Sequence, residues 1–255
     1  MALSSHELKQ AVAKAAVQEL PPNALLGVGT GSTVDCFIDA LAEAGLSIQA
    51  AVSSSVRSEQ RLRDLGIEVL SLNDVEQPLD VYVDGADEID GTGCMIKGGG
   101  AALTREKIVA SASKAFLCIV DESKQVKTLG RFPLPIEVIE MAIRPVSRAL
   151  LAMGGQPKVR EGVLTDNGHC ILDVHGLSIA DPLEWDDRLN AIPGIVAHGV
   201  FARQKAAKVL VSTQQGVQVV SFILHQTAII LSYLRPLPSV PLVITWLYPN
   251  YFLFW

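Results

Sequence analysis

Short apolar segments alternate with helical patterns through the first half of this sequence. Val, Ile, Leu and Ala fill the segments with little of the polar alternation seen in half-exposed strands, which is typical of strands buried on both faces. We expect strands at 24–28, 48–52, 67–70, 79–83 and 115–120, and helices before Pro21 and at 34–45, 57–65 and 101–112. Such alternation predicts an α/β fold with a doubly wound, mostly parallel sheet.

The pattern changes after Gly130. Strands are expected at 136–139, 159–164, 170–174 and 195–201, and helices at 144–153 and 182–190. The order βαββαβ is that of a ferredoxin-like α+β domain, and Asn167-Gly168 favours a hairpin between its middle strands. A strand at 208–212 would return to the first sheet. The sequence thus predicts a discontinuous α/β domain, residues 1–131 and 203–221, that carries the catalytic groups. Residues 132–202 would form a small lid or oligomerisation domain.

The last 34 residues, 222–255, differ in composition from the rest of the chain. They contain one charged residue, Arg235, and eight of the fourteen aromatic residues. Four prolines interrupt the segment, and proline costs about 3 kcal/mol in a helix interior. An uncharged stretch of about 20 residues is long enough for a membrane anchor. We favour a non-native extension outside the fold, so a membrane is expected as a partner only if this tail is a genuine part of the protein.

Charge and cysteine content narrow the class of protein. The 255 residues carry a net charge of −6, with no run of Lys or Arg, which disfavours nucleic acid as a partner. The four cysteines have no CxxC spacing, and His169, His175 and His198 fit no metal motif. The N-terminus has no apolar core typical of a signal peptide. We expect a reduced, cytoplasmic protein without a metal or another cofactor.

Residues 84–106 hold the densest set of chemically useful groups. Asp84 and Asp87 follow the strand at 79–83, and Lys97 is followed by three glycines and then by Glu106 in a helix. Acids, a cation and exposed backbone amides suit proton transfer beside a developing oxyanion. Each motif alone is compatible with a solvated or flexible loop. Together, after a strand of an open α/β sheet, they lie where such sheets bind ligands.

A second glycine-containing loop, residues 29–33, separates a strand from a helix. Backbone amides, hydroxyls and the helix dipole favour an anion such as phosphate there. The loop is not GxGxxG, because Ser32 takes the place of the last glycine, and no acid ends the next strand, so a dinucleotide site is disfavoured. A tight turn that needs glycine for its φ angles remains an alternative. Since parallel strands end at one edge, Thr30, Asp84 and Lys124 are expected to share one pocket.

The motifs GVGTGST, AVSSS, YVDGADEID, IKGGGAALTREKI, DESK, FPLPIEV, GVLTDNG and LDVHG occur in this order. Together they resemble ribose-5-phosphate isomerase of type A over roughly residues 5–220. The resemblance implies interconversion of ribose 5-phosphate and ribulose 5-phosphate by a metal-free enediolate mechanism. It also implies a homo-oligomer, commonly a dimer. The tail has no counterpart in the family pattern.

The resemblance also assigns roles. It implies that Glu106 is the proton acceptor, with Lys97, Asp84 and Asp87 as further catalytic groups. The implied substrate-binding residues are Thr30, Gly31, Ser32, Thr33, Asp84, Gly85, Ala86, Asp87, Lys97, Gly98, Gly99, Gly100, Lys124 and, less directly, Lys9. The division of roles between Asp84 and Asp87 stays open at this point. The rival functions are a sugar-phosphate-sensing module, which would have no need of Glu106, and a dehydrogenase.

Overall fold

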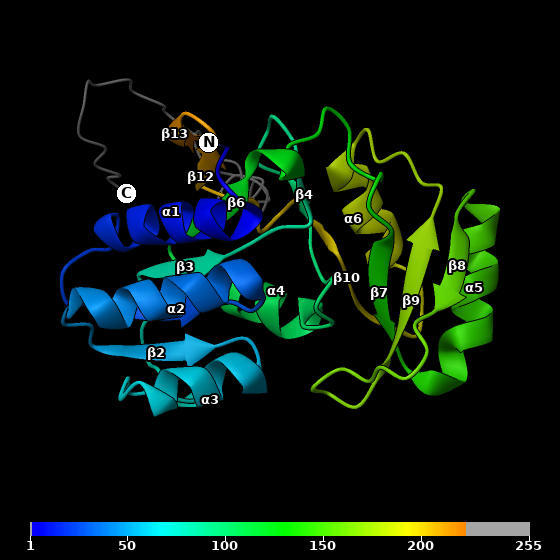
Figure 1. Ribbon diagram of the computed structural model, residues 1–255. Coiled ribbons are helices and arrows are strands. Elements are labelled where there is room, and N and C mark those ends of the chain that lie inside the picture. Colours follow the sequence, from blue (N-terminus) through cyan, green and yellow to red (C-terminus); the bar gives the residue numbers. More distant parts are fainter. Residues whose placement is uncertain (1, 223–255) are drawn as a thin grey trace, which may run out of the picture. The chain divides into compact units, whose positions relative to one another are not determined.

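The computed structural model describes residues 2–222, which form one compact unit. Its main sheet has six strands in the order β13-β12-β6-β3-β1-β2 (Figure 1). All neighbouring strands are parallel except β12 and β13, which form a C-terminal hairpin. The strands are β1 (Leu25–Val28), β2 (Ala50–Ser53), β3 (Val81–Asp84), β6 (Phe116–Asp121), β12 (Lys208–Thr213) and β13 (Gly216–Ser221).

Helices cover both faces of this sheet. On one face, α1 (Ser5–Gln18) and α2 (Ser32–Ala44) pack against alternate strand residues such as Leu26 and Val28, and α3 (Val56–Asp64) lies beside α2 and β2. On the other face, α4 (Leu103–Ser111) packs against the intervening residues, such as Leu25. Burial on both faces explains the continuous apolar strands. The predicted doubly wound, mostly parallel α/β sheet is confirmed.

A second sheet has four antiparallel strands in the order β10-β7-β9-β8. Two helices, α5 (Ile143–Ala152) and α6 (Pro182–Asn190), pack with it around a separate apolar cluster. The chain order β7-α5-β8-β9-α6-β10 is the expected ferredoxin-like arrangement. Its strands are β7 (Leu134–Val138), β8 (Gln156–Val159), β9 (Cys170–His175) and β10 (Ile195–His198).

A third, small sheet joins the two parts of the molecule, and the sequence did not indicate it. It contains β4 (Glu88–Ile89), β5 (Met95–Ile96) and β11 (Val200–Phe201). The single strand expected at 195–201 is therefore wrong, because the chain changes sheets at Gly199. The N–H of Gly199 donates to Pro135 O at 2.8 Å, and its carbonyl accepts from Lys97 N–H at 2.9 Å. A Cβ at this position would lie 2.3 Å from Lys97 O, which explains why glycine is required.

Two further expectations about strands are wrong. Residues 67–70 make only one isolated parallel bridge, Ala51 to Val69, because their backbone hydrogen bonds to the main sheet are limited to those with Ala51. The strand expected at 159–164 ends at Val159, which pairs with Leu172. Arg160 N–H still donates to Ile171 O at 2.9 Å, but residues 161–164 lie outside the strand. Three 3-10 turns complete the fold: η1 (Leu72–Asp74), η2 (Glu122–Lys124) and η3 (Glu140–Ala142).

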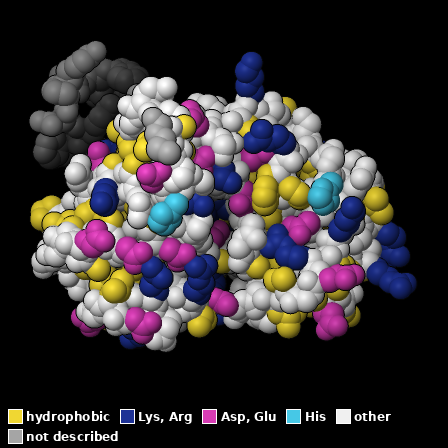
Figure 2. Space-filling model, in the orientation of Figure 1, with side chains coloured by type: hydrophobic (Ala, Val, Ile, Leu, Met, Phe, Trp, Pro, Cys, Tyr) yellow, Lys and Arg dark blue, Asp and Glu magenta, His cyan; other side chains and the backbone are white. Residues whose placement is uncertain are grey.

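The described residues include Phe222, the first residue of the predicted tail. Its N–H donates to Ala207 O at 2.8 Å, and its ring packs beside Gly93. Residues 223–255 lie outside the described part of the chain, so the tail and the domain boundaries stay predictions. Within residues 2–222, no helix has the length and hydropathy needed to cross a membrane. On the face shown in Figure 2, basic side chains lie among acidic ones.

Candidate active site

The carboxyl ends of β1, β3 and β6 lie at one edge of the main sheet, as parallel pairing requires. Thr30 follows β1, Asp84 is the last residue of β3, and Lys124 follows β6. The loop after β1 contacts the end of β3 directly, because Gly29 N–H donates to Val83 O at 2.9 Å and Thr30 N–H donates to Asp84 Oδ1 at 3.2 Å. Two segments more than 50 residues apart in sequence thus form one polar surface.

Asp84 is fully buried, and every contact it makes stabilises a carboxylate. Oδ1 accepts from the N–H groups of Thr30 and Gly85, the latter at 2.7 Å. Oδ2 accepts from the Tyr82 hydroxyl and from Lys97 Nζ, the latter at 2.7 Å. Burial, followed by the charges of Asp84 and Glu106, raises the pKa of the Tyr82 hydroxyl well above its usual value, so it donates as a neutral phenol. Asp84 is therefore a fixed anion that holds its neighbours.

Lys97 lies between two carboxylates and is only 3% exposed. Besides Asp84, its ammonium donates to Gly85 O at 2.6 Å and lies 3.3 Å from Glu106 Oε2. Burial alone would lower the pKa of Lys97, but Asp84 and Glu106 outweigh burial and raise it. Lys97 is therefore a permanent cation in the core of the site. Removing one partner of such a buried pair typically costs about 3–5 kcal/mol of stability.

Glu106 lies in the first turn of α4, where the helix dipole favours an acid. It is 3% exposed, and its Oε2 has no hydrogen bond despite the nearby Lys97 ammonium. Burial raises the pKa of Glu106 to about 8; Lys97 acts in the opposite direction, and Asp84 and Asp87 add to the increase. A buried carboxyl beside a cation, with a pKa near neutrality, has the properties of a general base.

The loop Lys97-Gly98-Gly99-Gly100 connects β5 to α4 and brings backbone close to Asp87. Gly99 N–H donates to Asp87 Oδ2 at 2.8 Å, and a Cβ on Gly99 would lie 2.6 Å from Asp87 Oδ1. Gly98 has φ +105°, and Ala101 has φ +61°, which is uncommon for a residue with a side chain. Burial raises the pKa of Asp87, while the Gly99 hydrogen bond, Lys97 and Lys124 act against this increase.

The loop at residues 30–33 ends in α2, whose N-cap is Gly31 with φ +111°. No side chain caps this helix, so its first N–H groups have no side-chain acceptor. Ser32 accepts a hydrogen bond from Lys9 Nζ at 2.9 Å, which brings a cation from α1 to the same helix end. Thr30 Oγ1 accepts from the Ser55 hydroxyl at 3.0 Å. This arrangement suits a phosphate group.

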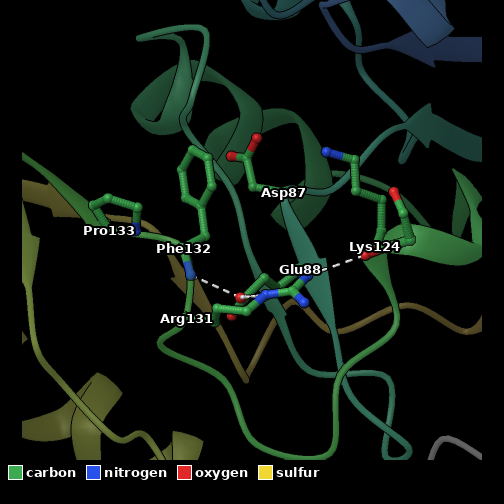
Figure 3. Close-up of a pocket in the computed structure, with 7 residues that line it drawn as sticks. Asp87, Glu88, Lys124, Arg131, Phe132 and Pro133 are labelled. Carbon is green, nitrogen blue, oxygen red and sulfur yellow. Dashed lines mark hydrogen bonds and ion pairs between the residues drawn. The ribbon is translucent and has the colours of Figure 1, made fainter.

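Lys124 lies on η2 and lines a hollow of about 260 Å³ together with Asp87 (Figure 3). The opposite wall of this hollow includes Arg131, Phe132 and Pro133, which no sequence motif had marked as part of the site. The buried Glu88 fixes that wall by accepting from Gly130 N–H and Phe132 N–H at 2.8 and 2.7 Å. Lys124 forms no hydrogen bond or ion pair with Lys97 or Glu106.

Most of the expected site residues thus lie together. Asp84, Gly85, Lys97, Glu106 and Thr30 form one connected cluster; Gly100 lies near Thr30, and Asp87 lies at the glycine loop. The methyl group of Ala86 is an exception, because it packs against the apolar core and leaves only backbone for a ligand.

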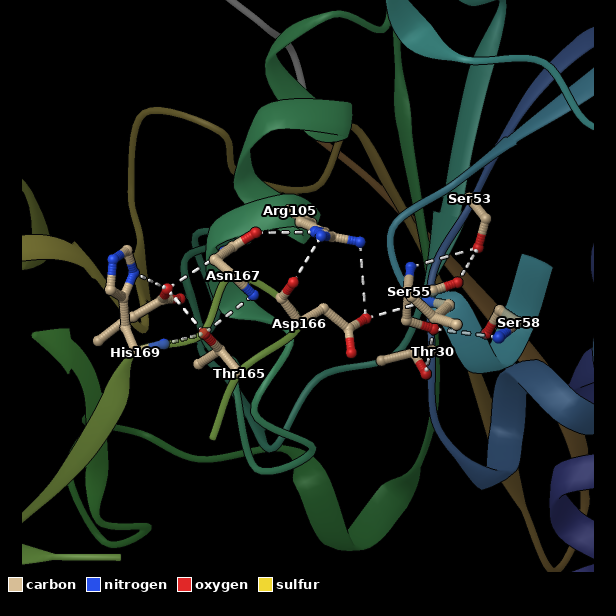
Figure 4. A network of polar contacts seen from close by, with 11 residues as sticks. Thr30, Ser53, Ser55, Ser58, Arg105, Thr165, Asp166, Asn167 and His169 are labelled. Carbon is tan, nitrogen blue, oxygen red and sulfur yellow. Dashed lines mark hydrogen bonds and ion pairs between the residues drawn. The ribbon is translucent and has the colours of Figure 1, made fainter. Parts of the chain in front are cut away.

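Sequence reasoning missed a polar network that reaches the site from the second sheet (Figure 4). Its centre is Glu137, a buried carboxylate that accepts from Thr165, Asn167 and His169. From Asn167 the contacts continue to Arg105, beside Glu106 in sequence. Asp166 then accepts from Val56 N–H at 2.9 Å, next to Ser55. Asn167 is 62 positions from Arg105, and Asp166 is 110 positions from Val56, so no local sequence spacing indicates these contacts.

Among residues 2–222, no cluster of His, Cys, Asp and Glu side chains is arranged to hold a metal ion. The positive charge in the cluster comes instead from Lys97. The backbone N–H groups of Gly85 and Gly99 also lie in the site, where they donate to Asp84 and Asp87 respectively.

Comparison with known proteins gives consistent matches. The family model of ribose 5-phosphate isomerase A (phosphoriboisomerase A) matches residues 50–216. The chain is 58% identical over 221 residues to ribose-5-phosphate isomerase A of Leptothrix cholodnii, covering 86% of this chain and 100% of the relative. The crystal structure of ribose 5 phosphate isomerase A from Neisseria gonorrhoeae matches with a TM-score of 0.86 and 48% identity, covering 88% of this chain and 100% of that one. A D-ribose-5-phosphate isomerase in complex with phospho-erythronic acid matches with a TM-score of 0.82 and 37% identity, covering 86% and 100% of the two chains.

Proposed function

Because this chain belongs to the ribose 5-phosphate isomerase A family, we propose that it interconverts D-ribose 5-phosphate and D-ribulose 5-phosphate through an enediolate. The reaction would serve the non-oxidative pentose phosphate pathway. The observation that carries the proposal is the buried Glu106 carboxyl, whose Oε2 lies 3.3 Å from the Lys97 ammonium. A base next to a fixed cation is what proton abstraction beside a carbonyl needs.

Glu106 is the base in this proposal. In the open-chain aldose it takes the proton from C2, and the C2–H electron pair forms the C1–C2 double bond of the enediolate. The charge that develops on the C1 oxygen is stabilised by Lys97, whose ammonium is already desolvated and oriented by Asp84. Glu106 then returns its proton to C1, while the proton of the C2 hydroxyl passes to the C1 oxygen, which gives the ketose with its carbonyl at C2. One carboxylate can serve both carbons.

The two aspartates have different roles in this proposal. All the contacts of Asp84 hold it as an anion, and it is fully buried, so we assign it to positioning Lys97. Asp87 is partly exposed, lines the hollow with Lys124, and has a raised pKa. It is better suited to moving a proton between the two hydroxyl oxygens and to assisting ring opening.

The phosphate group is proposed to bind at the N-terminus of α2. Its charge of about −2 at neutral pH is matched there by backbone N–H groups, the Ser32 and Thr33 hydroxyls and Lys9. Lys124 would contact the substrate from the other side of the site. The related isomerase solved with phospho-erythronic acid binds a compound with a phosphate and a sugar-acid chain, which is consistent with such a site.

We further propose that the enzyme is a cytoplasmic homodimer. The resemblance supports a homodimer, and the four unpaired cysteines are compatible with the reducing cytoplasm. Sedimentation equilibrium of the purified chain measures the oligomeric state directly. A monomer at micromolar concentration would contradict the dimer without affecting the proposed reaction.

A coupled assay for ribulose 5-phosphate formation tests the central proposal. The chain should convert ribose 5-phosphate, and it should fail with unphosphorylated ribose at the same concentration. Tight binding of ribose 5-phosphate with no turnover would favour the sugar-phosphate-sensing module instead. Turnover that depends on added NAD would favour a dehydrogenase.

A further inference from the structure

Arg160, the residue directly after β8, reaches from the second sheet to the glycine loop. Its Nε and Nη2 donate to the two oxygens of Asp173 on β9, with the Nε contact at 2.8 Å. Its Nη1 donates to Gly99 O at 3.0 Å and to Gly98 O at 3.3 Å. The side chains of Arg160 and Asp173 are about four-fifths buried, with 18% and 21% exposed. A bidentate pair of this kind fixes the orientation of a guanidinium.

The contact with Gly98 bears directly on Asp87. Gly98 C=O and Gly99 N–H belong to one planar peptide and point in opposite directions. Arg160 binds the carbonyl of this peptide, while the N–H donates to Asp87 Oδ2 at 2.8 Å. Rotation of the peptide would break both contacts at once. Arg160 therefore constrains the group that positions the Asp87 carboxylate.

The loop itself has little intrinsic preference for this conformation. Three consecutive glycines are conformationally free, and Gly98 and Ala101 both have positive φ. A residue with a side chain in that region carries strain of about 1 kcal/mol or more, so outside contacts must hold the conformation. On the side away from Asp87, Arg160 supplies such contacts to two successive carbonyls.

We propose that Arg160, oriented by Asp173, is a positioning residue for the isomerisation. It holds the Gly98–Gly99 peptide so that Gly99 N–H fixes Asp87 and the start of the loop keeps Lys97 in place. Arg160 does not contact the substrate in this account; it acts through the loop. The inference rests on the proposed function, because its effect is measured in that reaction.

The experiment compares Arg160→Ala, Arg160→Lys and Asp173→Asn with the wild-type chain. The matched control is Arg203→Ala, which removes another arginine from an ion pair, with Asp187, that makes no contact with the loop. We expect kcat to fall at least ~10-fold for Arg160→Ala, since misplacement of a catalytic group by about 1 Å can cost 10²-fold. KM should stay within about threefold, because the proposed phosphate contacts are untouched. Arg160→Lys should recover part of kcat, and Asp173→Asn should give an intermediate loss.

Thermal unfolding separates positioning from simple stability. If Arg160 only supports the fold, Arg160→Ala lowers the unfolding temperature, the folded enzyme keeps its kcat, and the proposal is overturned. A kcat loss equal to that of Arg203→Ala overturns it as well. If the alanine variant does not fold, the Arg160→Lys variant tests the proposal instead. A kcat equal to that of the wild-type chain would then contradict the proposal. An inactive wild-type chain would instead refute the proposed function, which the coupled assay detects first.

Discussion

The backbone of Gly29 lies so close to the Asp84 side chain that a Cβ at position 29 would be 2.0 Å from Asp84 Cγ. Gly29 has no positive φ, so conformational freedom is not what requires glycine here. The contact between the ends of β1 and β3 is possible only because residue 29 has no side chain. Since Asp84 in turn binds Lys97, the geometry of the whole cluster depends on the absence of a side chain at residue 29.

Gly29→Ala should therefore displace the Asp84 carboxylate and reduce kcat at least ~10-fold. Gly91→Ala is the control, because Gly91 has open space around it and no positive φ. The measurement is kcat and the unfolding free energy of both variants. Equal activity of the two variants would show that the Asp84 cluster tolerates a shift of this size.

Glu106→Gln should fold, bind ribose 5-phosphate and lose turnover by about 10²–10⁴-fold, the usual contribution of a positioned base. Exchange of the substrate C2 proton with solvent deuterium should slow by the same factor. Glu7→Gln, at the exposed N-terminus of α1, is a control for the loss of a first-turn acid. If the Glu106 variant keeps most of its turnover, the base is Asp84 or Asp87.

The pH dependence should follow the same carboxyl. Because only ionised Glu106 can accept a proton, kcat/KM should fall as pH decreases through a pKa that burial raises to about 8. Lys97 stays charged throughout, since its pKa is raised. An acid limb near the ordinary glutamate value of 4.5 would contradict this assignment.

Stability should show the opposite trend with pH. A folded-state pKa above that of the unfolded chain means that the folded protein holds a proton between pH 4.5 and about 8 that the unfolded chain releases. The contribution of the Glu106 carboxyl to the unfolding free energy is thus fully present below that pH window and is lost as pH rises through it. The unfolding free energy of Glu106→Gln, measured by urea denaturation, should rise relative to wild type from pH 5 to pH 8. A difference in unfolding free energy between Glu106→Gln and wild type that stays constant with pH would contradict this prediction.

Lys9→Ala should raise KM about 10-fold with a smaller change in kcat, because Lys9 contacts the proposed phosphate site and not the reacting carbons. Some decrease in kcat is also expected, because remote binding energy can lower the barrier. Lys14→Ala, an exposed lysine on the same helix, should leave both constants unchanged. An unchanged KM for the Lys9 variant would indicate that the phosphate binds beside another cation, such as Lys124.

A chain that ends at Phe222 should keep its activity and gain solubility, because the matched family model ends at residue 216 and the described unit ends at Phe222. Ending one residue earlier, at Ser221, would also remove the ring that packs on the core beside Gly93. We expect the longer version to have the higher unfolding temperature. A folded but inactive chain ending at Phe222 would show that the tail takes part in function.

The part of the site that the sequence predicted is the part set by sheet topology. Thr30 and Asp84 follow buried parallel strands, so their meeting at one edge follows from the strand pattern. The helix expected at 101–112 is observed at Leu103–Ser111, and Glu106 lies in its first turn. Positive φ at Gly31 agrees with the tight-turn alternative, but Gly29 is required for a steric reason that spacing alone does not reveal.

The contacts that were missed all depend on how the second sheet packs against the first. Arg160 lies in what was expected to be a regular strand, where a side chain would point to solvent or core. Its real role depends on the strand ending at Val159 and on the position of Gly98, 62 residues away. The same is true of Asp166 and Val56, which are 110 residues apart.

The small third sheet also governs when the site can form during synthesis. Lys97 N–H is bound by the carbonyl of Gly199, and β5 pairs with β11, so the lysine loop lacks its partners until about residue 201 has left the ribosome. Contacts of such long sequence separation form late and slow folding. A nascent chain therefore holds its buried lysine and carboxylates unassembled for most of its synthesis, and the isomerase site becomes complete only when the end of the main sheet is being made.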